Sequence, residues 1–155
     1  MKHIDIWTDG ASRGNPGIGG YGIVLKYLDN NKVEHIRELK DAFEMTTNNR
    51  MELLSVIIAL KELKEPCEVN IISDSKYVVN AFNENWIDDW IKSDFRKGTK
   101  NEVKNIDLWE ELIKHSKIHK ITFHWVKGHS DNVENERCDK LANMAMDELI
   151  ENKLK

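Results

Sequence analysis

Residues 3–29 read HIDIWTDGASRGNPGIGGYGIVLKYLD, and this stretch decides the fold class. Its first part, His3 to Thr8, alternates apolar and polar side chains as a β-strand does. A turn-rich segment, ASRGNPGIGG, follows, and a second strand-like run begins at Tyr21. A third run, KVEHIREL, comes after the turn residues Asn30 and Asn31. The pattern predicts three strands joined as an antiparallel meander.

Beyond this meander, the sequence predicts helices that alternate with strands. A helix is expected at 50–64, because Thr46–Asn49 offers N-cap residues and the helix is apolar on most of its circumference. The other expected elements are strands at 68–73 and 120–126 and helices at 75–82, at 106–116 after a cap by Asn105, and from 134 onward. This order predicts an α/β fold, a five-stranded mixed sheet flanked by helices.

Length and composition indicate one domain covering residues 1–155, because 155 residues suit a single core. No apolar run reaches the roughly 20 residues that a membrane span requires. Asp5 and Asp9 interrupt the N-terminal stretch where a signal peptide would be apolar. We therefore expect a cytoplasmic monomer without a membrane partner. Cys67 and Cys138 fit free thiols in a reducing compartment and suit no zinc site, although the sequence leaves a disulfide open.

Four carboxylates lie at positions where a charge is unexpected. Asp9 closes the first strand, Glu52 interrupts the apolar helix, Asp74 ends the fourth strand, and Asp139 lies in the amphipathic final helix. A carboxylate removed from water is costly unless it is paired or binds a metal. If the four converge, they form a pocket for hard divalent cations, chiefly Mg²⁺, and favour metal-assisted phosphodiester chemistry. Taken singly, each has a plainer interpretation: a turn cap for Asp9, a helix N-cap for Asp74, and solvated helix positions for Glu52 and Asp139.

Two further features bear on function. His129 lies in the loop GHS just after the fifth strand, where an imidazole could transfer a proton. The formal net charge of −4 argues by itself against a nucleic-acid partner. Cations bound by the four carboxylates would reverse the local field, however, so the global charge excludes little.

A glycine-rich stretch, GIGGYG at residues 17–22, matches the dinucleotide-binding fingerprint. That fingerprint requires a helix after it, whereas a strand is predicted here. We therefore expect these glycines to serve turns and close approach of backbones.

Five segments resemble the type 1 ribonuclease H family, close to its bacterial form: TDGASRGNPGIGGYG (8–22), TTNNRMEL (46–53), ISDSKYVV (72–79), KNIDLW (104–109) and WVKGHSDNVENERCDKLA (125–142). The resemblance implies an endoribonuclease that cuts the RNA strand of RNA/DNA hybrids, with a ribonuclease H-like five-stranded mixed sheet. Two Mg²⁺ ions per site, with Mn²⁺ as a possible substitute, would activate a water and stabilise the leaving oxygen from about 4 Å apart.

The resemblance also implies roles for individual residues. Those expected in catalysis are the four metal ligands Asp9, Glu52, Asp74 and Asp139, together with His129 for proton transfer or product release. Those expected to bind substrate are Asn15, Asn48 and Asn49 at the minor groove and the RNA 2′-hydroxyls, Thr47 at a DNA-strand phosphate, and Trp86 at the protrusion. An asparagine amide can both donate and accept, as a contact with a 2′-hydroxyl requires. Core packing is the plainer alternative for Trp86 and Trp90.

The protrusion departs from the strongly basic segment that bacterial relatives often carry. Residues 84–104 hold five acidic and five basic residues, so their net charge is zero. Fewer uncompensated cations release fewer counterions on binding. We predict weaker hybrid affinity and a shallower dependence of log K on log salt than for a relative with a basic protrusion. Titrations of both proteins over a range of salt would test this, and equally steep slopes would contradict it.

Two alternatives to a hybrid-specific ribonuclease remain. One is a nuclease of the same fold that acts on DNA, such as a resolvase or integrase relative; the segments TTNNR and NERCDKLA argue against it. The other is a non-catalytic module that binds hybrids, and the presence of all four carboxylates argues against that.

Overall fold

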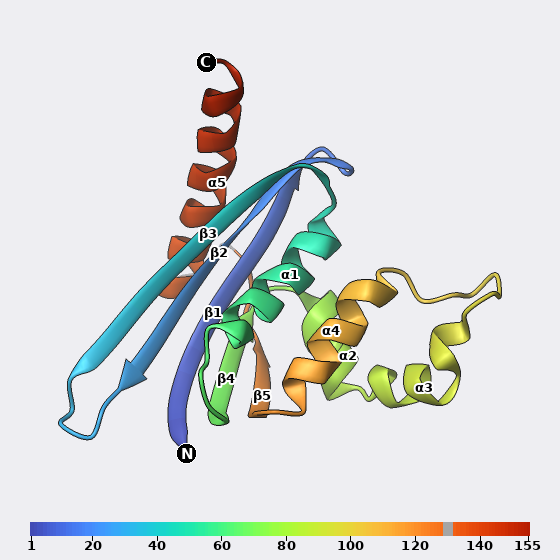
Figure 1. Ribbon diagram of the computed structural model, residues 1–155, viewed down its shortest axis with the longest axis horizontal. Helices are drawn as coiled ribbons and strands as arrows, with labels where there is room; N and C mark the ends of the chain where they lie inside the picture. The colour runs from blue at the N-terminus through green and yellow to red at the C-terminus, as the bar shows by residue number, and fades with distance from the viewer. Residues whose placement is uncertain (129–131) are drawn as a thin grey trace.

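The computed structural model describes residues 1–128 and 132–155. Its centre is a five-stranded sheet with the strand order β3-β2-β1-β4-β5 (Figure 1). Strands β1, β2 and β3 form the antiparallel meander, while β4 and β5 run parallel to β1. The strand bounds are Lys2–Arg13 (β1), Gly17–Leu28 (β2), Glu34–Thr46 (β3), Cys67–Ser73 (β4) and Lys120–Trp125 (β5). The predicted mixed sheet is confirmed.

Helices cover both faces of this sheet. On one face, α1 lies between the sheet and α4, and α5 crosses the other face over β2 and its neighbours (Figure 1). The bounds are Asn48–Lys61 (α1), Lys76–Asn83 (α2), Trp86–Lys92 (α3), Asp94–Arg96 (the 3₁₀ helix η1), Ile106–Ser116 (α4) and Val133–Lys153 (α5). Alternation along the strands sends Ile6 and Ile23 into the core beneath α1. It sends Val24 to the opposite face, where it packs on Cys138 and Leu141.

The segment ASRGNPGIGG is not the loop that its composition predicts. Strand β1 continues to Arg13 and β2 begins at Gly17, so the turn is confined to residues 14–16. Cross-strand pairs such as Ala11 with Gly20 extend the antiparallel ladder through the glycine-rich stretch. Pairing with two neighbouring strands outweighs the low strand propensity of glycine here.

Helix caps account for where the helices near the site begin. The Thr47 hydroxyl accepts a hydrogen bond from the amide of Arg50 at the start of α1 (3.2 Å). Helix α2 is capped by Ser75, whose hydroxyl accepts from the amide of Val78, so the interpretation of Asp74 as the N-cap is wrong. Asn105 occupies the N-cap position of α4, but its side chain makes no capping hydrogen bond. The left-handed backbone at Asn105 (φ 62°) turns that side chain to other partners.

Two expectations about the chain's environment can be compared with the structure. Within the described ranges, no helix combines the length and apolarity needed to cross a bilayer. Cys67 and Cys138 are both free and buried, which confirms the free thiols expected from the sequence.

Candidate active site

Register between parallel strands brings Asp9 and Asp74 together. Thr8 on β1 pairs with Ser73 on β4, and each aspartate is the next residue along its chain. Asp9 is buried at 8% exposure, and Asp74 is half-buried. The carboxyl ends of parallel strands are where α/β sheets bind ligands, because the strand ends there open into a crevice.

Close packing of α1 on β1 brings Glu52 to the same place. Gly10 follows Asp9, and a Cβ atom added to it would lie 2.5 Å from the backbone nitrogen of Glu52. Such a separation is impossible for a real side chain, so glycine allows the first turn of α1 to rest on the strand. Glu52 therefore lies beside Asp9, although the two are 43 positions apart in the chain.

Asp139 reaches the site through a similar approach on the other face of the sheet. Gly22 is the register partner of Asp9 on β2. A Cβ atom on Gly22 would overlap the carbonyl oxygen of Cys138, the residue before Asp139. The glycine thus lets α5 touch the sheet directly opposite Asp9, as expected for a glycine that serves close backbone approach.

The carboxylates line one pocket of about 200 Å³. One carboxylate oxygen from each of Asp9, Glu52 and Asp74 lies within 4.8 Å of the other two. Asp139 lines the pocket but is not one of these three converging groups. The remaining lining residues are Gly10, Ala11, Asn48, Asn135 and Glu136. Of these five, only Asn48 was predicted from the sequence; Gly10, Ala11, Asn135 and Glu136 were not, and the apolar strand before Gly10 was the one signal that could have suggested a close approach.

Burial and mutual repulsion make these carboxyl groups reluctant to ionise. Burial raises the pKa of Asp9 to about 9, and the neighbouring carboxylates, Asp74 first, add to the rise. Burial also raises the pKa of Glu52 to about 7, with a hydrogen bond from Ser75 opposing the change. Like charges close together in a site of low polarity cannot all ionise without a compensating cation. This explains why a divalent ion would be held here.

The donor set fits a hard divalent cation. Carboxylate oxygens are the ligands that Mg²⁺ prefers, and Mg²⁺ usually retains several water molecules that need hydrogen-bond acceptors. Among the described residues, Oδ1 of Asn135 is the one buried side-chain oxygen or nitrogen without a hydrogen-bond partner. Asn135 lines the carboxylate pocket and is 3% exposed. An orphaned buried acceptor of this kind calls for a missing ion or water.

We expect metal-free protein to become less stable as the pH rises from about 5 to about 8, because of the raised pKa of Asp9. Its usual pKa is 3.8, and in the folded protein it is about 9. Between these values the folded chain holds more protons than the unfolded chain, so the free energy of unfolding falls with rising pH. Asp9→Asn removes the cost of ionising this buried carboxyl group. Without metal, the Tm of Asp9→Asn should therefore exceed that of wild type, and the difference should be larger at about pH 8 than at about pH 5.

Calorimetry in EDTA at both pH values would measure the difference. Added Mg²⁺ should raise the Tm of wild type, because it binds only the folded protein. The difference in Tm between Asp9→Asn and wild type should then become smaller. A lower Tm for Asp9→Asn at the higher pH would contradict this account.

Four of the expected substrate-binding residues lie together around the start of α1, where Asn48 lines the pocket. The side-chain oxygen of Asn48 accepts hydrogen bonds from the amide and the hydroxyl of Ser12 (2.6 and 3.1 Å). The amide of Asn48 donates to the side-chain oxygen of Asn15 (3.2 Å). Thr47 precedes Asn48 as the cap of α1. Asn49 is exposed on the first turn of the same helix.

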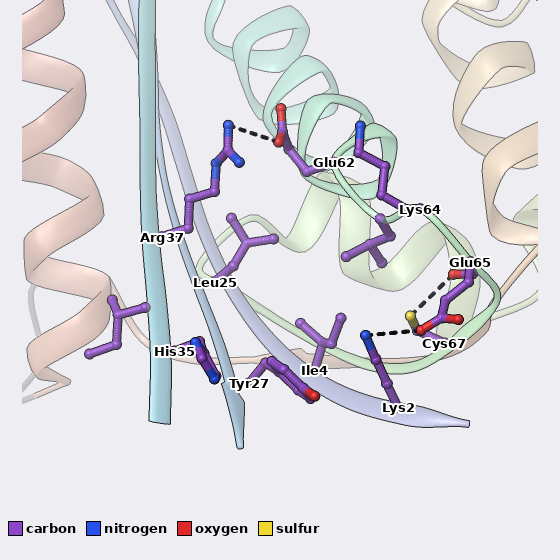
Figure 2. A pocket seen from close by; sticks show the side chains of 12 residues that line it. Lys2, Ile4, Leu25, Tyr27, His35, Arg37, Glu62, Lys64, Glu65 and Cys67 are labelled. Atoms are coloured by element: carbon purple, nitrogen blue, oxygen red, sulfur yellow. Dashed lines mark hydrogen bonds and ion pairs between the residues drawn. The ribbon is translucent and has the colours of Figure 1, made fainter. Parts of the chain in front are cut away.

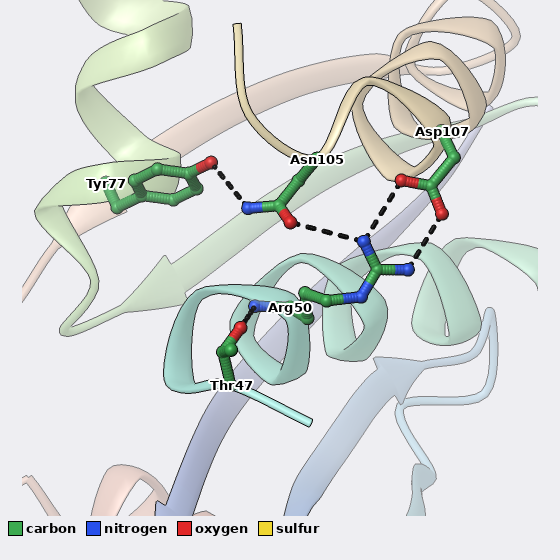
Figure 3. A network of polar contacts seen from close by, with 5 residues as sticks. All are labelled: Thr47, Arg50, Tyr77, Asn105 and Asp107. Atoms are coloured by element: carbon green, nitrogen blue, oxygen red, sulfur yellow. Dashed lines mark hydrogen bonds and ion pairs between the residues drawn. The ribbon is translucent and has the colours of Figure 1, made fainter. Parts of the chain in front are cut away.

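A polar network joins this cluster to α4 and α2 (Figure 3). Both terminal nitrogens of Arg50 donate to the carboxylate of Asp107 (3.0 and 2.7 Å). Arg50 also donates to Asn105 (3.2 Å), whose amide nitrogen donates to the hydroxyl of Tyr77 (3.1 Å). The network ties the start of α1 to the end of the protrusion at Asn105, and so fixes their relative position.

The remaining predicted residues lie away from the carboxylates or outside the described ranges. Trp86 begins α3 and is 37% exposed, and it does not line the pocket. Trp90 packs edge-on against the buried Trp109, with 4.9 Å between ring centroids. The core-packing alternative is therefore confirmed for Trp90, whereas Trp86 is more exposed, with its ring centroid 6.4 Å from that of Trp90. His129 lies outside the described residues.

A second pocket, of about 250 Å³, lies near the other ends of β1 and β2, beyond the last turn of α1 (Figure 2). Its interior is apolar at Ile4, Leu25 and Leu63. The acidic groups at its rim are paired, Glu65 with Lys2 and Glu62 with Arg37, both at 3.1 Å. It lacks converging carboxylates, so the smaller pocket is the candidate active site.

Comparison with known proteins shows the family to which this chain belongs. The family model for RNase H matches residues 1–147. A ribonuclease H of Lachnoclostridium phytofermentans is 53% identical over 145 residues, covering 93% of this chain and 92% of that protein. A ribonuclease H of Clostridium botulinum is 54% identical over 151 residues, covering 96% and 98%. The crystal structure of LC9-RNase H1, a type 1 RNase H with the type 2 active-site motif, is 28% identical with a TM-score of 0.85, covering 94% of this chain and 72% of that one.

The fold and the acidic pocket therefore define a metal-dependent nuclease. This chain belongs to the RNase H family.

Proposed function

We propose that this protein is an endoribonuclease that hydrolyses the RNA strand of RNA/DNA hybrids with two divalent metal ions. The observation that carries the proposal is the convergence of Asp9, Glu52 and Asp74, from three separate elements, to within 4.8 Å. Membership of the RNase H family supplies the substrate class. Carboxylates held this close favour cation binding over any role in structural ion pairing.

Mg²⁺ is the proposed cofactor, with Mn²⁺ as a substitute. Asp9, Glu52, Asp74 and Asp139 would hold it, and Asn135 would offer its buried carbonyl oxygen to the hydrated ion. When bound, the ions supply Lewis-acid activation of water and neutralise charge on the leaving oxygen. The chain itself would hold the carboxylates on strand ends and helix turns, which are rigid. None of the residues that line the pocket is a lysine or arginine, so no basic side chain would compete with the metal there.

Substrate recognition is assigned to the side chains beside the pocket. Asn15, Asn48 and Asn49 would read the minor groove and 2′-hydroxyls, and Thr47 would hold a DNA-strand phosphate. Ser12 orients the side-chain amide of Asn48, and the backbone N–H of Asn48 holds the side-chain oxygen of Asn15. These contacts support the assignment, because a preset amide loses less entropy on binding. Trp86 would extend the contact along the protrusion, and His129 would assist proton transfer or product release.

Three further expectations stay with this proposal. The proposed enzyme is a monomer with one RNase H domain, residues 1–155, which holds all four carboxylates of the pocket. The two free, buried cysteines suit the reducing cytoplasm.

The test is a substrate panel: labelled RNA/DNA hybrid, RNA duplex, DNA duplex and single-stranded RNA, each with Mg²⁺, with Mn²⁺ and with EDTA. We expect cleavage of the hybrid's RNA strand alone, and none in EDTA. Cleavage of DNA would instead indicate a DNA nuclease of the same fold. Hybrid binding without cleavage in either metal would indicate a binding module, and either of these results would overturn the proposal.

A further inference from the structure

Trp125 makes a contact with the candidate metal site that its exposed position does not suggest. It is the last residue of the edge strand β5, where it pairs in parallel register with Ser73. The residue is 44% exposed, yet its indole nitrogen donates a hydrogen bond to the backbone carbonyl of Asp74 (3.0 Å). The ammonium of Lys76 lies 4.8 Å from the ring centroid. A cation over an indole face is attractive, so Lys76 helps hold the ring in this orientation.

The neighbouring backbone is fixed on both sides of Asp74. The amide of Val126 donates to the carbonyl of Ser73 (3.0 Å), and the amide of Ser75 donates to the Ser73 hydroxyl (3.0 Å). Gly128 passes so close that an added Cβ would lie 2.9 Å from Oδ2 of Asp74. The chain that leaves β5 therefore runs directly against the Asp74 carboxylate, and Trp125 ties the start of that chain to Asp74 itself.

We propose that Trp125 is a positioning residue, whose indole N–H holds Asp74 in the orientation that divalent-metal binding requires. The inference rests on the proposed function, because it concerns the same site. Carboxylates that repel one another tend to turn apart, and a hydrogen bond to the backbone of one of them opposes that movement. A partner behind a ligand commonly changes metal affinity or activity by about 10- to 100-fold when it is removed.

The decisive variant is Trp125→Phe, which keeps an aromatic ring for Lys76 but lacks the N–H donor. Trp7→Phe is the matched control. Trp7 lies on β1 two residues before Asp9, and the ammonium of Lys26 lies 5.5 Å from its ring centroid. Its indole nitrogen, unlike that of Trp125, makes no hydrogen bond to any described residue. Benzothienylalanine at position 125, in which sulfur replaces the N–H, keeps the ring size if phenylalanine disturbs folding.

Four quantities should be measured for each variant: Tm, kcat, KM for the hybrid, and the Mg²⁺ concentration at half-saturation in an NMR titration without substrate. We expect Trp125→Phe to raise the half-saturating Mg²⁺ concentration by about 10-fold and to lower kcat at limiting Mg²⁺ by a similar factor. High Mg²⁺ should restore most of the rate. KM and the values for Trp7→Phe should stay within about two-fold of wild type.

Unchanged Mg²⁺ binding in both variants of Trp125 would overturn the inference. So would a loss of Mg²⁺ affinity in Trp7→Phe equal to that in Trp125→Phe. A fall in Tm without a change in Mg²⁺ binding would show that the contact serves only stability, which also contradicts it. If wild type binds Mg²⁺ but does not cut the hybrid, the proposed function fails, while the NMR comparison of the variants still decides the role of Trp125.

Discussion

Asp74→Asn is expected to lower the rate of hybrid cleavage by about 10³-fold and to leave the protein folded. The amide has the size of the carboxylate but lacks its negative charge. The pocket then loses one of the three converging groups that would bind the cation. Asp9→Asn should have an effect of the same size, because Asp9 is the most buried of the four acids.

The measurement is kcat under saturating hybrid and Mg²⁺, with circular dichroism and Tm to confirm folding. Asp147→Asn is the matched control, because Asp147 lies on α5 outside the pocket and pairs with Arg13 (2.7 Å). The kcat of Asp147→Asn should stay within about two-fold of the wild-type value, since an exposed ion pair contributes little to stability. Turnover of Asp74→Asn at the wild-type rate would remove Asp74 from the mechanism.

Gly22→Ala is expected to reduce the free energy of unfolding by about 3 kcal/mol, which lowers the Tm by roughly 6–12 °C. Its Cβ would overlap the Cys138 carbonyl oxygen and lie 2.8 Å from Cβ of Leu141. Both atoms belong to the interior of a long helix, so α5 would have to move away from the sheet. Asp139 would move with it, and cleavage should fall as well.

Thermal unfolding and cleavage assays of the same preparation would measure both effects. Gly98→Ala is the control for replacing a glycine where no close packing is involved. Nothing lies within 4 Å of a Cβ atom added to Gly98, so only the backbone φ of +78° disfavours alanine there. That variant should lose only about 1 kcal/mol. A Tm for Gly22→Ala no lower than that of Gly98→Ala would show that α5 does not pack on β2 as described.

The sequence predicted the order of the five strands and of helices α1, α2, α4 and α5, because each of these elements has a local signal; α3 and η1 were not predicted. Alternation marks β1, capping residues precede α1, and an apolar run marks β4. Where two local signals compete, the prediction from the sequence was wrong. Glycine and proline in residues 11–20 predicted a loop, yet pairing with a neighbouring strand extended β1 and β2 through most of it. Asp74 offered an N-cap for α2, but in the folded chain Ser75 is the cap.

The candidate site was predictable in its acidic residues but not in its supporting contacts. Asp9, Glu52, Asp74 and Asp139 stood out because each placed a charge at a position predicted to be apolar or buried. Asn135 did not stand out, because an asparagine near a helix start has an ordinary local explanation. Its significance lies in an orphaned oxygen, which becomes visible only when the surrounding side chains are in place.

By itself, the sequence determined most of the segments that become strands and helices and which acids are candidates for a metal site, because these follow from periodicity and residue chemistry over a few neighbouring positions. Only the tertiary structure decided how those acids meet. Parallel register aligns Asp9 with Asp74, while Gly10 and Gly22 allow α1 and α5 to touch the sheet on either side. These contacts join residues far apart in the chain, so they depend on the packing of whole elements. The glycine-rich stretch predicted close backbone approach, but not which helix would make it.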